Sequence, residues 1–414
     1  MAQALSFSPY DRLTVQVPKN GSIDRLISAP DMPPFDPRIT DFMGALSRAL
    51  MKTPDARKFP EIVSLAHWMR PRAILELSQK FSATRPSGTL SLSRGIALHF
   101  APGNVDTIFL YSALLAILTG NRNIVRVSSR PSPQIDLLIE VLNNLLADPA
   151  HASVADRLLI VRYDHDDTIT AALSELCDLR VIWGGDQTVQ NIRSHPLQPR
   201  ARDVSFPNRW SLAALSAPEV LALEQNALSK LAVDFTNDAF WFGQMACSSP
   251  RVVVWVGEQD QASAAAARFW PAVRLAADRF ASEIQPVNFV NKLVSQNIAA
   301  IEGDLLEFVP LPDNVVCVGE LAALRAPDDD LCVGDGLFWE SRIDEISGIT
   351  SLLDKRSQTV ISFGIPADDW TQVIIEAGAQ IDRIVPFGQA LQFGHIWDGM
   401  DLLTEFSRLV AVDI

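Results

Sequence analysis

The 414-residue sequence lacks the features that would indicate a metal site, a disulfide framework or a polyanionic partner. Its four cysteines form no Cys-x-x-Cys pair and its six histidines form no His-x-x-x-His pair, so we expect neither bound metal nor structural disulfides. Basic charge is scarce as well. The net charge of −14 disfavours binding to nucleic acid or to an anionic membrane surface.

Long apolar runs are also missing. The longest, residues 105–119, contains Asp106 and Ser112 and falls short of the ~20 residues that a membrane span needs. The first twenty residues lack a basic start and a continuous apolar core, which argues against a signal peptide. We therefore expect a cytoplasmic protein without a transmembrane segment, in which 48% hydrophobic residues fill the cores of two or three domains.

Strands and helices alternate from residue 90 onward. Residues 90–100 predict a strand, 105–119 a helix that Gly120 ends, and 123–128 a second strand, which together have the size of a βαβ crossover. The alternation continues with helices expected at 133–146, 167–176 and 186–194 and strands at 158–163 and 180–183. It predicts a parallel, doubly wound sheet.

Two further regions flank this alternation. Ahead of it, helices are expected at 39–52 and 60–80. Beyond residue 215 a second α/β block is expected, with a helix at 218–231, a strand at 251–256 and long helices to about residue 301. Its remaining strands are expected near 315–318, 359–363 and 382–385.

Cys247 is the candidate nucleophile. It lies on a loop of small residues, between the end of a helix and the strongly β-forming run RVVVWV. A thiolate is nucleophilic near neutral pH and readily forms thioesters, so this position suits acyl transfer. The alternative, a core cysteine, fits Cys177, Cys317 and Cys332 better because each lies within an apolar run.

The turn after the first strand of the alternation holds Asn104, beside the expected start of a helix. A side-chain amide next to free backbone N–H groups provides the hydrogen-bond donors that an oxyanion hole needs. An ordinary βα turn, with the asparagine as a helix cap, explains the same residues equally well.

Two other turns suit a nucleotide. Arg126 ends a strand and is followed by Ser128 and Ser129, a set that suits a ribose phosphate, although a surface arginine at a strand end is common. Gly184 and Gly185 open a helix whose N–H groups could hold a pyrophosphate. The spacing is not Gly-x-Gly-x-x-Gly, so it is not the standard dinucleotide fingerprint.

In this order the segments resemble the aldehyde dehydrogenase superfamily and, more closely, its fatty acyl-CoA reductases from bacterial luminescence operons. The resemblance covers about residues 90–414. It is carried by GIALHFAPGNV, LTGNRNIVRVSS, VIWGGDQTV, FGQMACSSPRVVVWVG and GAQIDRIVPFGQAL followed by IWDGMDL. It implies an aldehyde dehydrogenase-like α/β fold, with a Rossmann-like cofactor domain, an α/β catalytic domain and the active site in the cleft between them.

The domain boundaries expected from this resemblance divide the chain into four parts. Residues 1–90 form a partly helical N-terminal extension, and 91–216 form the Rossmann-like NADP-binding domain. Residues 217–385 form the catalytic domain with Cys247, and 386–414 return to the first domain or to a partner subunit as an oligomerisation segment.

The resemblance also implies roles for single residues. Cys247 resembles the catalytic thiol, preceded by the family's Gly-Gln pair with Gln244, and Asn104 resembles the side-chain donor of the oxyanion hole. Arg126 stands where the superfamily usually has a lysine on the adenosine ribose. Gly184 and Gly185 occupy the turn beside the pyrophosphate.

His395 and Asp398 belong to the segment HIWDG, which is similar to a signature near the family's C-terminus. No chemical step can be assigned to this segment from the sequence. A structural role for His395 is the preferred interpretation, while support of the catalytic residues or acid–base chemistry remain alternatives.

Two departures from the superfamily pattern bear on the reaction. The superfamily's general base for hydrolysis, a glutamate, should fall within residues 204–218, where this sequence has no carboxylate, so a thioester could persist long enough to be reduced. NAD-preferring members carry a glutamate where this chain has Ser129, so we expect NADPH, with NADH second. Asp186, at the start of the pyrophosphate helix, is unfavourable to this interpretation.

These expectations predict a homo-oligomeric enzyme that reduces a fatty acyl-CoA or a carrier-bound acyl thioester to the aldehyde. The resemblance suggests that an ATP-dependent acyl-protein synthetase supplies the acyl group. Two alternatives remain: a reductase of an acyl phosphate, and an acyl-binding or acyl-transfer subunit that keeps the fold without reducing anything.

Overall fold

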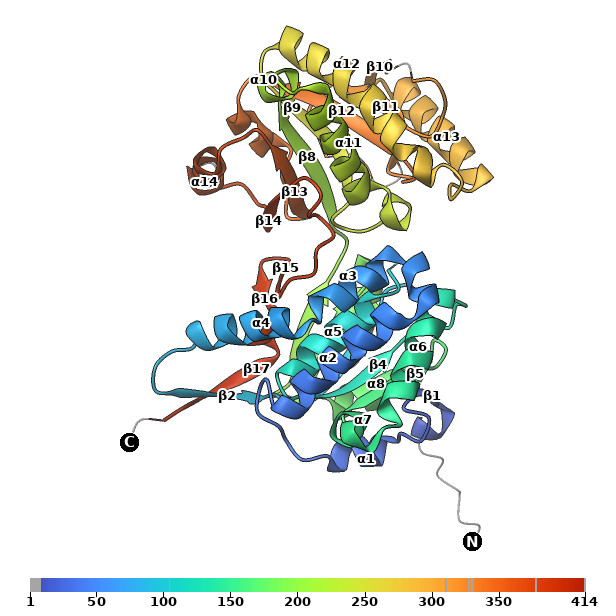
Figure 1. Cartoon of the computed structure of the whole chain (residues 1–414), viewed down its shortest axis with the longest axis vertical. Coiled ribbons are helices and arrows are strands. Elements are labelled where there is room, and N and C mark those ends of the chain that lie inside the picture. The colour runs from blue at the N-terminus through green and yellow to red at the C-terminus, as the bar shows by residue number, and fades with distance from the viewer. Residues whose placement is uncertain are drawn as a thin grey trace. The chain divides into compact units, whose positions relative to one another are not determined.

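A computed structural model describes residues 9–412 apart from residues 104, 310, 327, 329, 330 and 377. The chain forms two units, one comprising Met1–Pro207 with Phe393–Ile414 and the other Asn208–Gln392. Each unit is built around its own twisted sheet with helices on its faces (Figure 1).

The sheet of the first unit has the strand order β1-β5-β4-β3-β6-β7. Every neighbouring pair is parallel except β1 with β5, so β1 is an antiparallel edge strand. From β3 the chain adds strands to one side as far as β5 and then crosses to β6 on the other side, which is the doubly wound arrangement of dinucleotide-binding folds. The predicted parallel, doubly wound sheet is confirmed. The strands are β1 (Thr14–Val17), β3 (Ile96–Phe100), β4 (Arg122–Arg126), β5 (Leu158–Arg162), β6 (Leu179–Trp183) and β7 (Arg202–Phe206).

Helices cover this sheet, and α5 is the most deeply placed of them. All of its residues are buried, which is why its sequence is apolar on every side and not on one stripe. The longer helices of the unit are α2 (Pro37–Lys52), α3 (Pro60–Trp68), α4 (Pro71–Ala83), α5 (Ile108–Leu118), α6 (Pro133–Leu146), α8 (Asp167–Leu176) and α9 (Asp186–Arg193).

Two predicted elements of this unit are each divided in the structure. The single helix expected at 60–80 is wrong: Pro71 begins a new helix, α4, because its ring and missing N–H fit a first turn and not a helix interior. The single strand expected at 90–100 is also wrong. Gly95 adopts φ +132°, and this turn separates β2 (Thr89–Ser93), which pairs with β17 (Ser407–Ala411), from β3.

A buried polar network joins α5 to the middle of the sheet. His99 on β3 is fully buried, with Nδ1 2.8 Å from Ser112 Oγ and Nε2 2.9 Å from Asn123 Oδ1. Asn123 Oδ1 can only accept, so the network assigns the ring proton to Nε2. Trp183 Nε1 donates to the same Ser112 hydroxyl at 3.1 Å. Burial lowers the pKa of His99 to about 4, which keeps the ring neutral.

This network predicts an acid sensitivity of the first unit. The native state holds His99 neutral while the unfolded chain takes up a proton, so stability falls on acidification from pH 6.5 to about 4, by on the order of 3 kcal/mol. His99→Gln should remove this part of the pH dependence, measured by hydrogen–deuterium exchange in β3 and β4 peptides. His165→Gln, at an exposed site, is the control, and an equal pH dependence in both variants would contradict the assignment.

The second unit contains a seven-stranded sheet of order β10-β11-β12-β9-β8-β13-β14. Its neighbouring pairs are parallel except β10 with β11, so here too an edge strand runs antiparallel. The strands are β8 (Trp210–Ser216), β9 (Pro250–Val256), β10 (Leu305–Phe308), β11 (Cys317–Leu321), β12 (Leu337–Ile343), β13 (Ser357–Phe363) and β14 (Arg383–Pro386).

The helices of the second unit include one more correction. The helix expected at 218–231 is wrong, because α10 (Ala217–Leu221) ends and α11 (Gln225–Ala239) begins within that range. Arg268 donates to the carbonyl oxygens of Leu221 and Leu223, so these carbonyls between the two helices are paired with a side chain. The other long helices are α12 (Gln259–Ala276), α13 (Pro286–Glu302) and α14 (Ala367–Glu376). Across the residues described, the structure has no helix with the length and apolar character needed to cross a membrane.

Candidate active site

The loop that carries Cys247 begins with an unusual backbone turn. The 3-10 helix Trp241–Gln244 follows α11, and three consecutive residues in it, Phe242, Gly243 and Gln244, have φ of 58°, 58° and 63°. This left-handed region suits glycine but costs a residue with a side chain on the order of 1–3 kcal/mol. Phe242 and Gln244 therefore need other contacts that hold them there.

The side chain of Gln244 supplies such contacts. It is 1% exposed, and its Nε2 donates to the carbonyl oxygens of Pro250 at 2.9 Å and Leu337 at 3.0 Å. Its Oε1 accepts from the N–H of Gly336 at 2.8 Å. These bonds tie the loop to the first residues of β9 and β12. Gln244 thus positions the loop on which Cys247 lies, three residues further on.

A second left-handed turn interlocks with the first. Gly334, Asp335 and Gly336 have φ of 78°, 50° and 88°, and the N–H of Asp335 donates to the carbonyl of Gly243 at 2.9 Å. A Cβ on Gly334 would lie 2.3 Å from that same carbonyl oxygen, so this close approach requires glycine.

Lys292 on α13 binds backbone carbonyls in and beside the second turn. Its ammonium is buried and donates to the carbonyl oxygens of Asp335 at 2.8 Å and Val315 at 3.1 Å, and also to that of Asn314. Burial lowers the pKa of Lys292. With its donors directed at backbone oxygens, Lys292 acts as a structural cation and not as a catalytic base.

The half-buried thiol of Cys247 lies against the first residues of two neighbouring strands. Gln358 Nε2, on β13, donates to Cys247 Sγ at 3.2 Å. Ser211 Oγ, on β8, donates to the Cys247 carbonyl at 2.7 Å and accepts from the N–H of Thr359 at 3.1 Å. Because β9 begins just after Cys247, the thiol lies at the amino-terminal edge of three adjacent strands. Both side chains are neutral, and the Gln358 amide is the hydrogen-bond donor to the sulfur atom.

Ser211 and Gln358 were missed from the sequence. They lie 36 and 111 residues from Cys247 along the chain, and only the order of β8, β9 and β13 in the sheet brings them together. Ser211 falls within the segment 204–218, where the sequence has no carboxylate, so the side chain that this segment brings to the cysteine loop is a hydroxyl.

The other three cysteines are buried, as predicted. Burial raises the pKa of Cys177 to about 12 and also raises the pKa of Cys317. A thiol reagent applied to the native protein should therefore modify Cys247 first.

Gln358→Met tests the amide donor on the thiol. The substitution keeps the length and apolar body of the side chain but removes the N–H, so alkylation of Cys247 by iodoacetamide at pH 7.5 should slow about tenfold, since hydrogen bonds to charged groups contribute ~1.5–3 kcal/mol. Peptide mass spectrometry gives the rate for each cysteine. Gln372→Met, at an exposed site on α14, is the control; equal rates in the two variants would show that the amide does not activate the thiol.

The first unit offers the place for a dinucleotide. In doubly wound sheets ligands bind outside the carboxyl ends of the strands, where the strand order reverses, and here that point lies between β3 and β6. The turn that follows β3 contains Asn104, which lies outside the described residues. The turn that follows β6 contains Gly184 and Gly185.

The glycine turn fits a pyrophosphate. Gly185 is the N-cap of α9, and no side chain makes a capping hydrogen bond at the start of this described helix. The N–H groups of a first turn point out of the N-terminal end of the helix, where they can bind an anion. A Cβ on Gly184 would come within 3.1 Å of Thr188, so this glycine allows the strand and the helix to pack closely. Asp186 is exposed, which leaves its carboxylate room to turn toward solvent.

The expected ribose site lies at the end of β4. Arg126 is half-buried, with Nη2 donating to the Tyr163 carbonyl at 3.4 Å and the guanidinium 5.6 Å from the Tyr163 ring. Ser128 Oγ accepts from the N–H of Arg130 at 3.1 Å, while Ser129 and Arg130 are exposed. The last residue of β4 and the turn that follows it thus offer two cations and two hydroxyls, a set that suits a phosphorylated ribose.

His395 and Asp398 belong to a hairpin of the first unit. Strands β15 (Ile396–Trp397) and β16 (Met400–Asp401) are joined through Asp398 and Gly399, both with positive φ, which is the usual arrangement for a two-residue hairpin turn. The His395 carbonyl accepts from the N–H of Leu402, and burial lowers the pKa of its ring. Trp397 packs on Tyr111 and Trp183, with ring centroids 5.4 and 5.6 Å apart.

The segment 386–390 is held by a buried carboxylate. Asp238 on α11 accepts from the N–H groups of Gly388 at 2.5 Å and Ala390 at 2.9 Å. Burial raises the pKa of Asp238 to about 7. This contact ties the last motif of the second unit to the helix that leads into the Cys247 loop.

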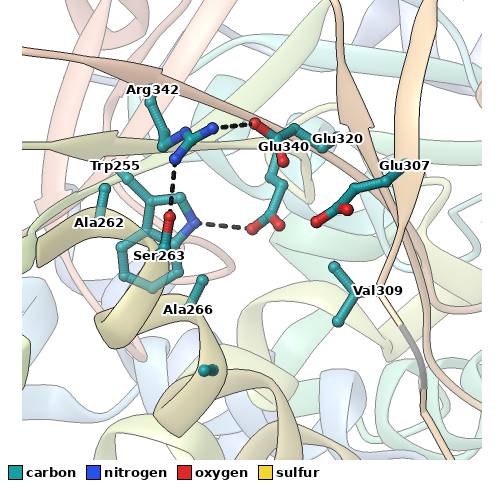
Figure 2. Close-up of a pocket in the computed structure, with 10 residues that line it drawn as sticks. Trp255, Ala262, Ser263, Ala266, Glu307, Val309, Glu320, Glu340 and Arg342 are labelled. Atoms are coloured by element: carbon teal, nitrogen blue, oxygen red, sulfur yellow. Dashed lines mark hydrogen bonds and ion pairs between the residues drawn. The ribbon is translucent and has the colours of Figure 1, made fainter. Parts of the chain in front are cut away.

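Figure 2 shows a pocket of about 190 Å³ elsewhere in the second unit, near the carboxyl ends of β9 and β11. The Glu340 side chain in it accepts from the indole N–H groups of Trp255 and Trp270, each at 2.7 Å, and burial raises its pKa. Arg342 donates to Glu320 beside it. These bonds link β12 to β9 and α12 at the end of the sheet opposite Cys247, so Glu340 has a structural role.

Comparison with solved structures defines the fold. The chain is similar to a lactaldehyde dehydrogenase with a TM-score of 0.64 at 12% identity, over 94% of this chain and 89% of that one. It is similar to a benzaldehyde dehydrogenase from Corynebacterium glutamicum with a TM-score of 0.58 at 12% identity, over 94% of this chain and 87% of that one. The fold is that of the aldehyde dehydrogenases.

The family follows from the sequence. The profile of the acyl-CoA reductase family LuxC matches residues 67–276, just over half of the chain, which therefore belongs to this family. Long-chain acyl-protein thioester reductases from Aliivibrio fischeri and Photorhabdus laumondii are each 26% identical, over 167 and 168 residues. Each match covers 40% of this chain and 33% of the relative, so it spans a third of those proteins.

Proposed function

We propose that the protein reduces a fatty acyl thioester, delivered by coenzyme A or by an acyl carrier, to the fatty aldehyde with NADPH. The observation that carries this proposal is the half-buried Cys247 thiol, in contact with the Gln358 amide, in a member of the LuxC family. A cytoplasmic location and supply by an ATP-dependent synthetase are parts of the same proposal.

The chain's own residues would act as follows. The Cys247 thiolate would attack the acyl carbonyl and form a bond from its sulfur to the acyl carbon. The bond from that carbon to the donor sulfur would break, and the donor would leave as a thiolate that takes up a proton from water. Asn104 and the backbone N–H of Cys247 would donate to the oxyanion. NADPH supplies the hydride that reduces the acyl group. When the aldehyde is released, the Gln358 amide would again donate to the Cys247 sulfur.

The absence of a carboxylate from residues 204–218, where the superfamily carries its general base, supports reduction over hydrolysis. A water molecule needs a general base before it can attack a thioester quickly at neutral pH. The segment 204–218 brings the Ser211 hydroxyl to the cysteine loop, and Ser211 already donates to a backbone carbonyl. The acyl-enzyme would thus persist until it is reduced.

Steady-state turnover of palmitoyl-CoA tests the nucleophile. NADPH oxidation with formation of the aldehyde is expected for the wild type, and Cys247→Ala should lower it at least about a thousandfold because the acyl-enzyme cannot form. Cys332→Ala is the control and should keep most of the activity. Turnover of an acyl phosphate but of no thioester would replace the proposed substrate, and acylation without NADPH oxidation would indicate an acyl-transfer subunit.

Ser129→Glu tests the choice of cofactor. A carboxylate at this exposed position would repel a 2′-phosphate and accept bonds from ribose hydroxyls, so the ratio of kcat/KM with NADPH to that with NADH should fall about tenfold or more. Ser129→Ala is the matched control and should leave the ratio nearly unchanged. A wild type that prefers NADH would contradict the assignment.

A further inference from the structure

Helix α13 (Pro286–Glu302) has its polar and apolar faces reversed relative to a usual surface helix. Its buried residues are Lys292, Ser295, Gln296 and Ala299. Six large apolar side chains point outward instead, within an arc of roughly 140° at 100° per residue. They are Val287 (61% exposed), Val290 (57%), Leu293 (50%), Val294 (49%), Ile298 (40%) and Ile301 (85%). We call these six residues the α13 stripe.

The orientation of α13 is fixed by its inward face. The buried Lys292 ammonium donates to three backbone carbonyls that hold the turn beside the Cys247 loop. Turning the helix to bury the stripe would bring this ammonium out of that site and leave those carbonyls unpaired, which is costly. The stripe is therefore a stable outward surface of the unit.

The size of this surface fits a protein interface. Strand β10 adds two exposed apolar side chains, Leu306 (62%) and Phe308 (43%). Together with the α13 stripe they offer roughly 700 Å² of apolar surface, more than the patch of a typical monomer and close to the ~800 Å² per partner of a standard interface. The stripe contains no charged residue, because Lys292 points inward and Glu302 lies outside it.

The spacing of the stripe fits a second copy of the same helix. Val287, Val290, Val294 and Ile301 occupy the a and d positions of a heptad pattern, and Asn297 occupies the remaining d position. An uncharged seam is complementary to itself, and a single polar residue in such a seam can fix the register.

We propose that the α13 stripe is the interface between two copies of this chain, packed antiparallel about a twofold axis near Val294. In such an interface each residue meets the same surface of the partner, and the antiparallel arrangement also sets the two helix dipoles in opposite directions. This proposal does not depend on the proposed reaction.

Light scattering after size exclusion tests the interface. The wild type should have a mass that is an even multiple of 45.5 kDa, and Val290→Glu with Val294→Glu should halve it without changing the circular dichroism spectrum. Ile375→Glu, at a 74% exposed position on α14, is the control and should keep the wild-type mass. A monomeric wild type, or an unchanged mass in the double variant, would overturn the proposal.

Disulfide cross-linking tests the same interface without disrupting it, so the result does not depend on a variant that could fail to fold. In a Cys247→Ser background, Val294→Cys should give a disulfide-linked dimer under mild oxidation, because residues near a twofold axis meet their own copies within the Cα distance that a disulfide allows. Ile375→Cys should remain a monomer on the same non-reducing gel. Absence of a dimer for Cys at 290, 294 and 298 alike would contradict the twofold packing.

Discussion

The interlock of two left-handed turns is the constraint on which the candidate active site depends. Phe242 and Gln244 take up a backbone conformation that costs residues with side chains free energy, and the three hydrogen bonds of the Gln244 amide offset that cost. Lys292 holds the opposing turn through backbone carbonyls. Both turns lie beside the starts of β9 and β12, so the position of Cys247 follows from the order of strands in the sheet.

The proposed cofactor site and the proposed nucleophile lie at different ends of the strands in their respective sheets. In the first unit, the glycine turn and Arg126 lie at the carboxyl ends of parallel strands, where doubly wound folds bind dinucleotides. In the second unit, Cys247 lies at the amino ends of β8, β9 and β13, where Ser211 and Gln358 provide neutral hydrogen bonds. The Gln358 amide donates to the thiol, while the Ser211 hydroxyl holds the backbone carbonyl of the same residue.

Local signals predicted much of the fold. Helices α6 and α8 have the predicted bounds because Ser132 and Asp166 cap their first turns and apolar residues recur with helical spacing. The breaks between α3 and α4 and between α10 and α11 were missed for different reasons. Pro71 was visible in the sequence as a helix start. The break between α10 and α11 accompanies hydrogen bonds from Arg268, a residue more than 40 positions further along the chain, and no local pattern indicates them.

The candidate site was predictable only where the chain itself carried a motif. Cys247 and Gln244 could be found by resemblance, but no local pattern indicates that Gln358 contacts the thiol, because that contact depends on sheet order. The reversed faces of α13 were equally hidden. A valine-rich helix predicts burial, and only the structure shows that a buried lysine turns those valines outward.

The most direct test of the central claim is the intact mass of the protein after mixing with palmitoyl-CoA in the absence of cofactor. The account predicts a single added palmitoyl group, located on Cys247 by peptide mapping, that disappears when NADPH is added and is absent from Cys247→Ala. An unchanged mass with every activated acyl donor tried, or an adduct that persists in Cys247→Ala, would contradict it.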